Sequence, residues 1–403
     1  MPYDFEYSAE KQHSGTSKKW SFELLRCPLK EGRSHPIPMW LADMDFQTAP
    51  AVVEALQQAV ATGRFGYSCI TEAYGEAVAE WQRRRYGWTV DPGWMLQTAG
   101  VVAALSLAVQ TFTVPGDAVL IQTPVYARFG KLCHLHGRRS VTAPLRERCD
   151  SYAFDADEFA AVIRRERPKI FFLCNPHNPV GKVWRQDELH AMADLCLRHG
   201  VLVVSDEVHA DLVIAPDCRH VPMALIDAAF AQNTITCTSP SKSFNLSGLQ
   251  VSNVIVPDAA LRERLLHAME AQGASSVNAL GLIACEAAYR FGESWLGDLL
   301  DFLRGSHRHF GEAASRCLSP LRVFKSEALY LAWVDCRGLG MADAALDQFM
   351  LDYAGVWFVN GSNFGQGGEG FMRVNLACSR RLLDDAITRM KSALQDAPRA
   401  CRT

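Results

Sequence analysis

An acidic side chain and a lysine stand just beyond two neighbouring apolar runs of the chain. Asp206 directly follows the run 201–205, and Lys242 comes four residues after the run 234–238. The two residues are separated by about the length of one strand and one helix. Pyridoxal phosphate needs both groups, because a lysine amine holds its aldehyde as a Schiff base and an acidic side chain keeps its pyridine nitrogen protonated. Lys242 and Asp206 therefore indicate a site for this cofactor.

The elements that must position these two residues are the strands of a sheet. Between about residues 95 and 260, helix-period segments alternate with short apolar runs, a pattern typical of strands buried on both faces of a largely parallel sheet. The predicted strands are 118–122, 169–174, 201–205, 234–238 and 253–256, and the predicted helices include 100–113 and 187–199. We predict an α/β, doubly wound domain.

Three polar residues directly follow predicted strands: Asn175, Asp206 and Ser239. Doubly wound sheets bind ligands in the crevice beyond the carboxyl ends of their strands, so we expect these side chains near one site.

The pattern of predicted helices and strands changes after about residue 285. An amphipathic helix is followed by the strand-like run 329–334, another helix, and a final strand, 371–376, with a helix behind it. We predict an N-terminal arm at 1–48 that joins the small domain, a large cofactor-binding domain at 49–285, and a small α+β domain at 286–403.

Composition excludes several other classes of protein. The 403 residues are 49% hydrophobic and carry a net charge of -3. The chain therefore lacks the excess of positive charge that would favour binding to nucleic acid or to an anionic membrane surface. The basic runs 83–85 and 164–167 are expected to be solvated helix faces. The first residues lack the pattern of a signal peptide, and no apolar run approaches the roughly 18 residues that span a bilayer. We expect a cytoplasmic protein.

Metal and disulfide chemistry are not expected. The 13 cysteines form no C-x-x-C pair, and several lie inside apolar runs as small core residues do. The compact pair His134 and His136 lacks a spaced cysteine or carboxylate that would complete a metal shell.

Seven segments in order carry a resemblance to a known family. They are PMWLADMDF at 38–46, FGY at 65–67, TPVY at 123–126, NPHNPVG at 175–181, SDEVH at 205–209, SPSKSFN at 239–245 and RVNL at 373–376. The chain resembles fold-type I pyridoxal-phosphate enzymes of the class I/II aminotransferase superfamily, and within it the cystathionine β-lyase (carbon-sulfur lyase) branch. This resemblance runs almost end to end and implies a large, mostly parallel-sheet domain with a smaller α+β domain.

The resemblance implies that Lys242 binds the cofactor and then, freed by the incoming amino acid, removes the α-proton. A lysine can do this when desolvation or a neighbouring cation lowers its pKa. Asp206 would lie against the pyridine nitrogen. The structural alternatives are a surface lysine in a serine-rich loop and an aspartate that caps a helix.

Two further residues correspond to positions around the cofactor ring. Asn178 matches the residue that hydrogen-bonds the cofactor's phenolic oxygen, although the sequence NPHNP is also a strong turn signal. His209 stands three residues past Asp206, where aminotransferases often have a tyrosine and the lyase branch has histidine.

The phosphate of the cofactor needs backbone amides at a helix start and hydroxyl groups. The candidates are Gly100, Val101, Val102, Ser239 and Ser241. Aminotransferases commonly place an arginine eight residues beyond the lysine, but Gln250 stands there in this chain. This departure weakens a strict aminotransferase interpretation.

Three more residues complete the implied site. Tyr67 corresponds to a residue that reaches the phosphate of the neighbouring subunit, which implies a homodimer with shared active sites. Tyr126 matches the aromatic residue that stacks on the pyridine ring, or it is plain core. Arg373 is the expected clamp for the substrate's α-carboxylate, with a structural salt bridge as its alternative. The glycine-rich segment 361–370 precedes a strand rather than a helix and is not a phosphate loop.

The resemblance implies a carbon-sulfur β-lyase that cleaves L-cystathionine or related S-substituted cysteines to a thiol, pyruvate and ammonia. An amino-acid aminotransferase on the same scaffold is the first alternative, because it would share the lysine, aspartate and arginine. A regulatory protein that retains the cofactor site is the second.

Overall fold

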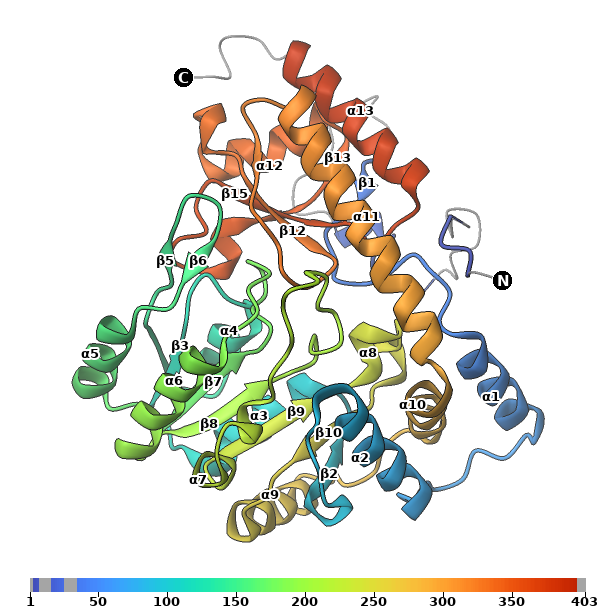
Figure 1. The fold of residues 1–403 in the computed structure, drawn as a ribbon, viewed down its shortest axis with the longest axis vertical. Coiled ribbons are helices and arrows are strands. Elements are labelled where there is room, and N and C mark those ends of the chain that lie inside the picture. Colours follow the sequence, from blue (N-terminus) through green and yellow to red (C-terminus); the bar gives the residue numbers. More distant parts are fainter. Residues whose placement is uncertain (1–2, 7–15, 25–34, 397–403) are drawn as a thin grey trace.

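A seven-stranded sheet forms the centre of the larger part of the molecule (Figure 1). The computed structural model describes residues 3–6, 16–24 and 35–396. In spatial order the strands are β2 (Met95–Thr98), β10 (Ser252–Ile255), β9 (Thr234–Thr238), β8 (Leu202–Asp206), β7 (Ile170–Cys174), β3 (Ala118–Ile121) and β4 (Arg139–Thr142). Pairs from β9 to β4 are parallel, and β10 is antiparallel to both neighbours. The predicted α/β fold with a mostly parallel sheet is confirmed.

Both faces of this sheet are buried, because alternate side chains enter two different apolar clusters. Leu120, Phe171 and Val203 belong to one cluster, whereas their neighbours Val119 and Phe172 belong to the other. Strand residues alternate between the two faces of a sheet, so a strand covered on both sides has a continuous apolar sequence. The five predicted strands therefore stand out in the sequence: 234–238 coincides with β9, and the other four differ from the observed strands by one residue at one or both ends.

Among the described residues, ten helices belong to this part of the molecule. They are α1 (Pro50–Ala61), α2 (Glu72–Tyr86), α3 (Val101–Phe112), α4 (Arg128–Leu135), α5 (Ala156–Glu166), α6 (Gln186–Arg198), α7 (Ala228–Ala231), α8 (Pro240–Ser243), α9 (Ala259–Ala271) and α10 (Ala279–Phe291). Those from α3 to α7 lie in the connections between the strands of the sheet, whereas α1 and α2 pack against α10. A two-stranded ribbon, β5 (Arg146–Glu147) with β6 (Tyr152–Ala153), extends from the sheet. The predicted helices at 100–113 and 187–199 are α3 and α6.

A second, antiparallel sheet lies in the upper part of Figure 1. Its order is β11 (Arg322–Val323), β12 (Leu331–Asp335), β15 (Phe371–Asn375) and β14 (Val359–Asn360). The helices of this part are α11 (Glu293–Cys317), α12 (Asp343–Asp352) and α13 (Arg380–Asp396). The predicted strands at 329–334 and 371–376 correspond to β12 and β15.

The chain before α1 pairs with this smaller part. Strand β1 (Ile37–Pro38) runs parallel to β13 (Val356–Trp357), and the backbone N–H of Asp45 donates to the carbonyl of Ala377 across 3.0 Å. The domain boundaries at 48 and 285 stay predictions; residue 285 lies within α10. Of the predicted arm and small domain, residues 1–2, 7–15, 25–34 and 397–403 lie outside the described residues.

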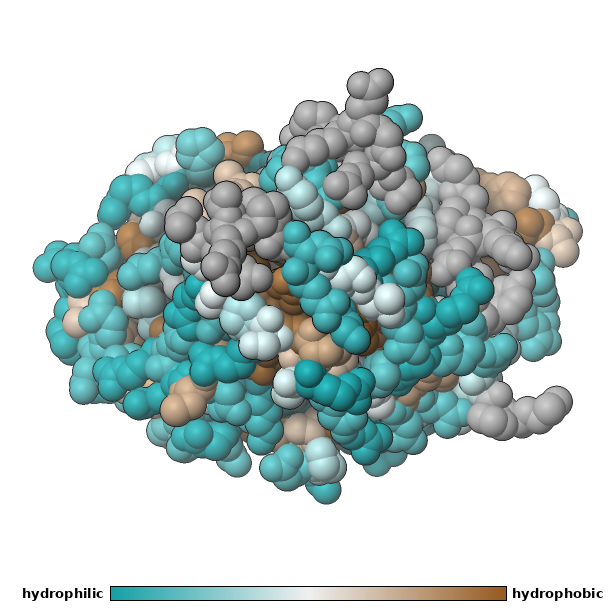
Figure 2. Space-filling model, turned by 90° about the horizontal axis from the view of Figure 1, so that it is seen from above, coloured by the Kyte–Doolittle hydropathy of each residue, from teal (hydrophilic) through white to brown (hydrophobic). Residues whose placement is uncertain are grey.

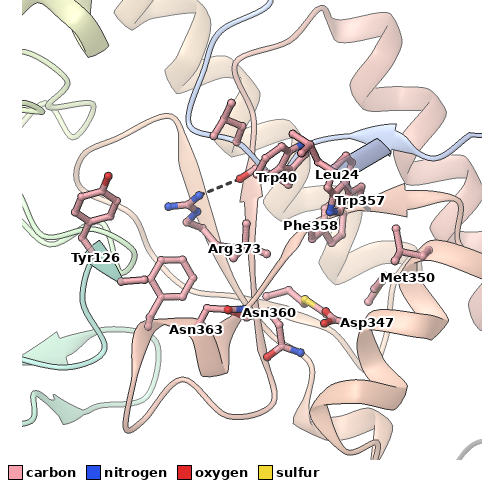
Figure 3. Close-up of a pocket in the computed structure, with 16 residues that line it drawn as sticks. Leu24, Trp40, Tyr126, Asp347, Met350, Trp357, Phe358, Asn360, Asn363 and Arg373 are labelled. Atoms are coloured by element: carbon pink, nitrogen blue, oxygen red, sulfur yellow. Dashed lines mark hydrogen bonds between the residues drawn. The ribbon is translucent and has the colours of Figure 1, made fainter. Parts of the chain in front are cut away.

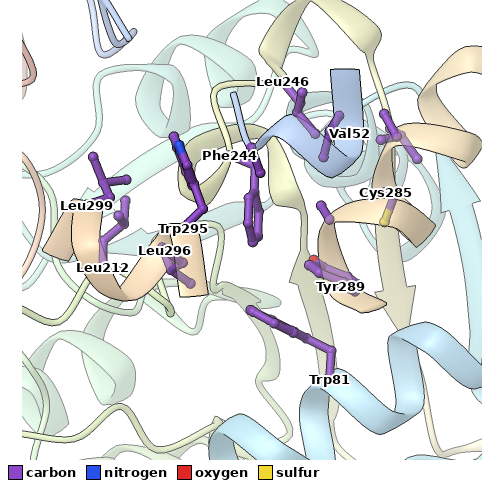
Figure 4. Packing of buried hydrophobic residues seen from close by; sticks show 14 of the residues in the cluster. Val52, Trp81, Leu212, Phe244, Leu246, Cys285, Tyr289, Trp295, Leu296 and Leu299 are labelled. Atoms are coloured by element: carbon purple, nitrogen blue, oxygen red, sulfur yellow. The ribbon is translucent and has the colours of Figure 1, made fainter. Parts of the chain in front are cut away.

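A cluster of aromatic residues anchors α8, the short helix that contains Lys242 (Figure 4). Phe244 directly follows this helix, is fully buried, and stacks on Trp295 of α11 with 5.7 Å between the ring centroids. Trp81 of α2 stacks on Tyr289 of α10 at 4.9 Å. Because the Phe244 ring is held on several sides, the turn that carries Lys242 has a fixed position.

The outer surface has the character expected from the composition. The face in Figure 2 is mostly hydrophilic, and its hydrophobic residues form small separate areas. Within the part of the chain that the structure describes, no helix combines the length and apolar character needed to cross a membrane.

Candidate active site

A cavity of about 300 Å³ lies where the carboxyl ends of β7 and β8 meet the start of α3 and the turn of α8. Ten of the residues singled out in the sequence line it: Gly100, Val101, Val102, Tyr126, Asn178, Asp206, His209, Ser241, Lys242 and Arg373. They come from segments up to 273 residues apart, and the crossover topology of the sheet brings them together. Of the three residues expected together at the strand ends, only Asp206 lines this cavity, whereas Asn175 and Ser239 do not.

Asp206 is the last residue of β8 rather than the first residue after it. The side chain is buried, and its Oδ1 accepts a hydrogen bond from the backbone N–H of Val208 at 3.3 Å. Burial raises the pKa of the carboxyl from 3.8 to about 7. A cation placed against this carboxyl would favour its ionised form, so the site is suited to holding a protonated ring nitrogen. Asp206 caps none of the described helices.

Lys242 projects from α8 with its amine at the cavity. Its Nζ donates to the carbonyl of Ala42 at 2.7 Å and to Oγ of Ser247 at 3.1 Å. Burial lowers the pKa of this amine, and the charge of Arg373 lowers it further, against the opposing effects of Asp43 and Asp206. A lysine in this setting has a larger neutral, nucleophilic fraction than an exposed lysine.

His209 is buried beside these groups. Burial, with the positive charges of Lys242 and Arg373, lowers the pKa of the imidazole to about 3, so the ring is neutral at pH 7. Its Nδ1 has no hydrogen-bond partner, and its ring meets that of Tyr330 edge-on at 6.2 Å. A neutral ring at this place can pack against a ligand or hydrogen-bond it without adding charge.

Arg373 is a buried cation on the central strand β15 of the second sheet. Its Nη1 donates to Oδ1 of Asn178 at 3.2 Å and its Nη2 to the carbonyl of Trp40 at 2.9 Å, whereas Nε has no partner. No carboxylate of the described residues forms an ion pair with it. Burial lowers the pKa of the guanidinium to about 10, which still leaves it charged at pH 7. A buried guanidinium with only neutral partners favours an anionic ligand.

The start of α3 offers a place for a phosphate. Gly100 is the N-cap residue, with a φ of +102° that a residue with a side chain adopts only under strain. The first N–H groups of a helix have no acceptor within it, and the helix dipole favours an anion there. Val101 and Val102 begin the helix, and Ser241 lines the same cavity.

Three predicted residues do not line this cavity. The side-chain amide of Asn175 donates to the carbonyl of Val221 at 3.0 Å instead. The hydroxyl of Ser239 caps α8: it accepts from the N–H of Ser241 at 3.0 Å and donates to the carbonyl of Val251 at 2.7 Å. Tyr67 is fully exposed, away from the cavity of its own chain. Gln250, which stands where aminotransferases have an arginine, does line the cavity.

Sequence reasoning did not single out three residues that contact the lysine or its surroundings. Ala42 and Ser247 accept the hydrogen bonds of Lys242, and Tyr330 also donates to the Ala42 carbonyl at 3.0 Å. A backbone acceptor leaves no signal in the identity of its residue. Ser247 lies five residues after Lys242, and this close spacing was the one available signal.

These residues fit pyridoxal phosphate. A buried acid, a lysine of lowered pKa, the first amides of a helix, and a buried guanidinium without an ion pair among the described residues all face one cavity. The chain belongs to the aminotransferase class I and II family, whose model matches residues 38–390.

Particular relatives are similar over nearly the whole chain. The chain is 40% identical to cystathionine beta-lyase PatB of Bacillus subtilis (strain 168) over 363 residues, which cover 90% of this chain and 94% of that protein. It is 32% identical to protein MalY of Escherichia coli (strain K12), over 97% of this chain and 99% of that protein. The crystal structure of cystalysin from Treponema denticola, which contains a pyridoxal 5'-phosphate cofactor, superposes with a TM-score of 0.93 at 33% identity, over 99% of this chain and 100% of that one.

Proposed function

We propose that this protein is a pyridoxal-phosphate-dependent carbon-sulfur β-lyase. It cleaves L-cystathionine or related S-substituted cysteines, with water, to a thiol, pyruvate and ammonia. The observation that carries this proposal is the convergence of Lys242, Asp206 and Arg373 on one cavity. The similarity to cystathionine beta-lyase PatB selects the lyase reaction among the reactions of the family.

Each residue contributes a separate part of the chemistry. Arg373 binds the α-carboxylate of the substrate and so fixes the α-carbon beside Lys242. The amine of Lys242, with its lowered pKa, takes the proton from the α-carbon. Bound pyridoxal phosphate supplies an electron sink for the resulting negative charge. A thiolate then leaves the β-carbon.

Asp206 and Asn178 tune the cofactor's ring. With the cofactor bound, the Asp206 carboxylate would hold a proton at the pyridine nitrogen, and the side-chain amide of Asn178 would donate to the phenolic oxygen. Arg373 donates a hydrogen bond of 3.2 Å to Asn178. This bond connects the residue that binds the substrate's carboxylate with a residue beside the cofactor ring. Tyr126 would stack on the ring and His209 would pack beside it. Because the imidazole of His209 is neutral, it would not compete with the ring nitrogen for the charge of Asp206.

The phosphate is held by the start of α3 with Ser241, and by Tyr67 of a second subunit. Ser239 contributes by capping α8. The exposure of Tyr67 supports this arrangement, since a fully exposed tyrosine next to the exposed Phe65 is a natural contact between subunits. The enzyme on this proposal is a cytoplasmic homodimer with shared active sites.

An aminotransferase is the second candidate, favoured by the family itself. Such an enzyme would transfer the amino group of the substrate to a keto acid through the cofactor and would not release a group from the β-carbon. Gln250 in place of an arginine at the cavity argues against it.

The experiment measures pyruvate and free thiol from L-cystathionine with the purified holoenzyme, alongside Lys242→Ala and the exposed-site control Lys131→Ala. Equal amounts of both products, lost only in Lys242→Ala, establish the lyase. Amino transfer to added keto acids without thiol release establishes the aminotransferase. Cofactor bound with neither reaction leaves a regulatory protein that retains the site.

A further inference from the structure

A second cavity, of about 250 Å³, adjoins the first on the side of the smaller sheet (Figure 3). Leu41, Tyr126 and Arg373 line both cavities. Arg373 therefore stands at the junction, with the lysine and aspartate on one side and the second cavity on the other. An amino acid whose carboxylate binds this guanidinium has its α-carbon at the mouth of both spaces.

The walls of the second cavity are mostly aromatic and aliphatic. Trp40 and Trp357 stack face to face with their ring centroids 4.5 Å apart, and Figure 3 shows Met350 and Phe358 farther along the same wall. Met350, Trp357 and Phe358 are at least nine-tenths buried. Leu24, from the short helix η2 (Phe22–Leu24), is at its rim.

The Trp40 wall is held in place by a buried ion pair. The indole Nε1 of Trp40 donates to the carbonyl of Lys19 at 2.9 Å, and Nζ of Lys19 lies 2.8 Å from Oδ2 of Asp45. Both charged side chains are almost fully buried. The indole therefore keeps its position and preserves the cavity without a ligand present.

The volume fits an aromatic ring. A protein cavity of about 150 Å³ lined by apolar side chains stays dry and binds benzene. The 250 Å³ available here accommodates a phenyl ring together with the linking methylene and sulfur. Burying such a ring against tryptophan gains both apolar contact area and aromatic packing.

The charges of the second cavity disfavour a second carboxylate. Among the described residues that line it, Arg373 is the only cation, and on the proposed function this group already binds the α-carboxylate. The one carboxylate, Asp347, repels a further carboxylate (Figure 3). The distal end of L-cystathionine carries an ammonium, which Asp347 attracts, and a carboxylate, which would be desolvated here without a cation to pair with.

We propose, on the basis of the proposed lyase function, that the second cavity binds the sulfur substituent of the substrate. The preferred substrates are cysteine conjugates with an uncharged aromatic or bulky aliphatic group on sulfur, ahead of L-cystathionine. Trp40, Trp357 and Met350 are the residues that determine this specificity.

The test compares three substrates in the holoenzyme: S-benzyl-L-cysteine, L-cystathionine and β-chloro-L-alanine, whose chloride leaving group does not need the cavity. Met350→Trp fills the cavity from inside, and Leu24→Trp narrows it from the exposed rim. Met341→Trp, which faces a separate cavity of about 360 Å³, is the matched control. We expect a wild-type kcat/KM for S-benzyl-L-cysteine at least tenfold above that for L-cystathionine. Met350→Trp lowers the benzyl value at least tenfold and changes the β-chloro-L-alanine value by less than twofold.

A binding measurement separates this inference from the proposed function. Calorimetry on Lys242→Ala holoenzyme, which cannot turn substrate over, is expected to give at least tenfold tighter binding of S-benzyl-L-cysteine than of S-methyl-L-cysteine, with the advantage lost in the double variant with Met350→Trp. Should Met350→Trp fail to bind cofactor, Leu24→Trp decides in its place. Equal binding of the two conjugates, or equal losses for all substrates, overturns the proposal. A benzyl advantage in binding without pyruvate from β-chloro-L-alanine means that the lyase function fails and the binding site stands.

Discussion

The amine of Lys242 and the hydroxyl of Tyr330 donate to the same backbone oxygen, the carbonyl of Ala42, at 2.7 and 3.0 Å. Lys242 belongs to α8 of the larger part, whereas Tyr330 directly precedes β12 of the smaller sheet. The segment around Ala42 therefore ties the two parts together at the active site. Its position controls where the lysine amine lies.

Asn245 is expected to hold this segment in place. Its Oδ1 accepts from the N–H of Met44 at 3.2 Å, and its Nδ2 donates to the carbonyls of Met44 and Phe46 at 3.1 and 2.9 Å. Its backbone has a φ of +56°. Asn245→Gly keeps this conformation and removes the hydrogen bonds, so we expect a loss of about 1–3 kcal/mol in the free energy of unfolding. Asn245→Ala adds strain of about 1 kcal/mol. Urea unfolding of the two holoenzyme variants measures whether Asn245→Ala is less stable than Asn245→Gly. Equal free energies of unfolding would contradict the prediction.

Arg373→Gln is expected to weaken substrate binding far more than it affects folding. Losing a charge-assisted pair with the α-carboxylate costs about 1.5–3 kcal/mol, so KM rises about 10-fold to 100-fold. The guanidinium has only neutral partners in the protein, and its removal does not strand a buried carboxylate. Steady-state kinetics and a thermal melt check the two parts. A lowered melting temperature with unchanged KM would assign Arg373 to structure instead.

Asp206→Asn is expected to change how stability depends on pH in cofactor-free protein. The folded pKa, about 7, lies above the ordinary value of 3.8, so between these pH values the folded state binds more protons than the unfolded state. The stability contributed by the neutral carboxyl is complete below pH 3.8 and is lost as pH rises through about 7. Asparagine is neutral at every pH. The free energy of unfolding of the variant therefore rises relative to that of the native protein between pH 4 and 7, and the difference stays constant above pH 7.

The check is a series of urea unfolding curves of the two cofactor-free proteins at pH 5, 6, 7 and 8. A stability difference that does not change with pH would show that Asp206 titrates normally. Addition of pyridoxal phosphate should remove the difference in slope, since a protonated ring nitrogen favours the ionised carboxylate.

The large sheet could be predicted from the sequence because its central strands are buried on both faces. Strand β4 (Arg139–Thr142) was missed, since its first two residues are exposed and its sequence has no apolar run. The end of β8 was placed one residue too early, because a polar Asp206 looks like the end of an apolar strand even when its backbone continues the ladder.

The candidate site was predictable to the extent that its chemistry depends on side-chain identity. Ten predicted residues line one cavity, because the order of the strands decides which loops meet. Ser239 was expected at the phosphate, but its hydroxyl caps α8; both functions favour the same residue type, so sequence alone does not separate them. The second cavity left no signal, since its tryptophans come from segments more than 300 residues apart.

Asp211 shows a further departure from the sequence-based expectation and gives another prediction. The basic run 83–85 was expected to be a solvated helix face, yet Arg85 is only 25% exposed and its Nε lies 3.4 Å from the buried Asp211 carboxylate. The same carboxylate accepts from Tyr86 and, at 2.7 Å, from Ser243, the residue after Lys242. Asp211→Ala leaves these buried donors without an acceptor, so we expect about 1–3 kcal/mol lower stability and a lower kcat.

Ser243→Ala removes only one of those donors and serves as the matched comparison. It should have a smaller effect on the free energy of unfolding than Asp211→Ala, measured in urea with the holoenzyme. Equal losses in the two variants would mean that Arg85 and Tyr86 contribute nothing to holding α8.

Tyr67 provides the test of a shared active site. Its side chain is fully exposed and lies outside the cavity of its own chain, so a function at the phosphate requires a second subunit. We expect Tyr67→Ala to weaken cofactor binding about tenfold, the effect of losing one hydrogen bond to a charged group. Lys242→Ala alone should be inactive. In the proposed homodimer, half of the dimers should be hybrids when the two inactive or weakened proteins are unfolded, mixed in equal amounts and refolded.

A hybrid dimer has one site that contains both Lys242 and the partner's intact Tyr67, and one site that lacks both. At a limiting cofactor concentration, where Tyr67→Ala alone is mostly unloaded, the mixture should therefore show more activity than the average of its two parents. Activity equal to that average would mean that Tyr67 acts within its own chain or not at all. The same mixing with Phe65→Ala in place of Tyr67→Ala controls for a general effect on the subunit contact, because Phe65 is also exposed but carries no hydroxyl.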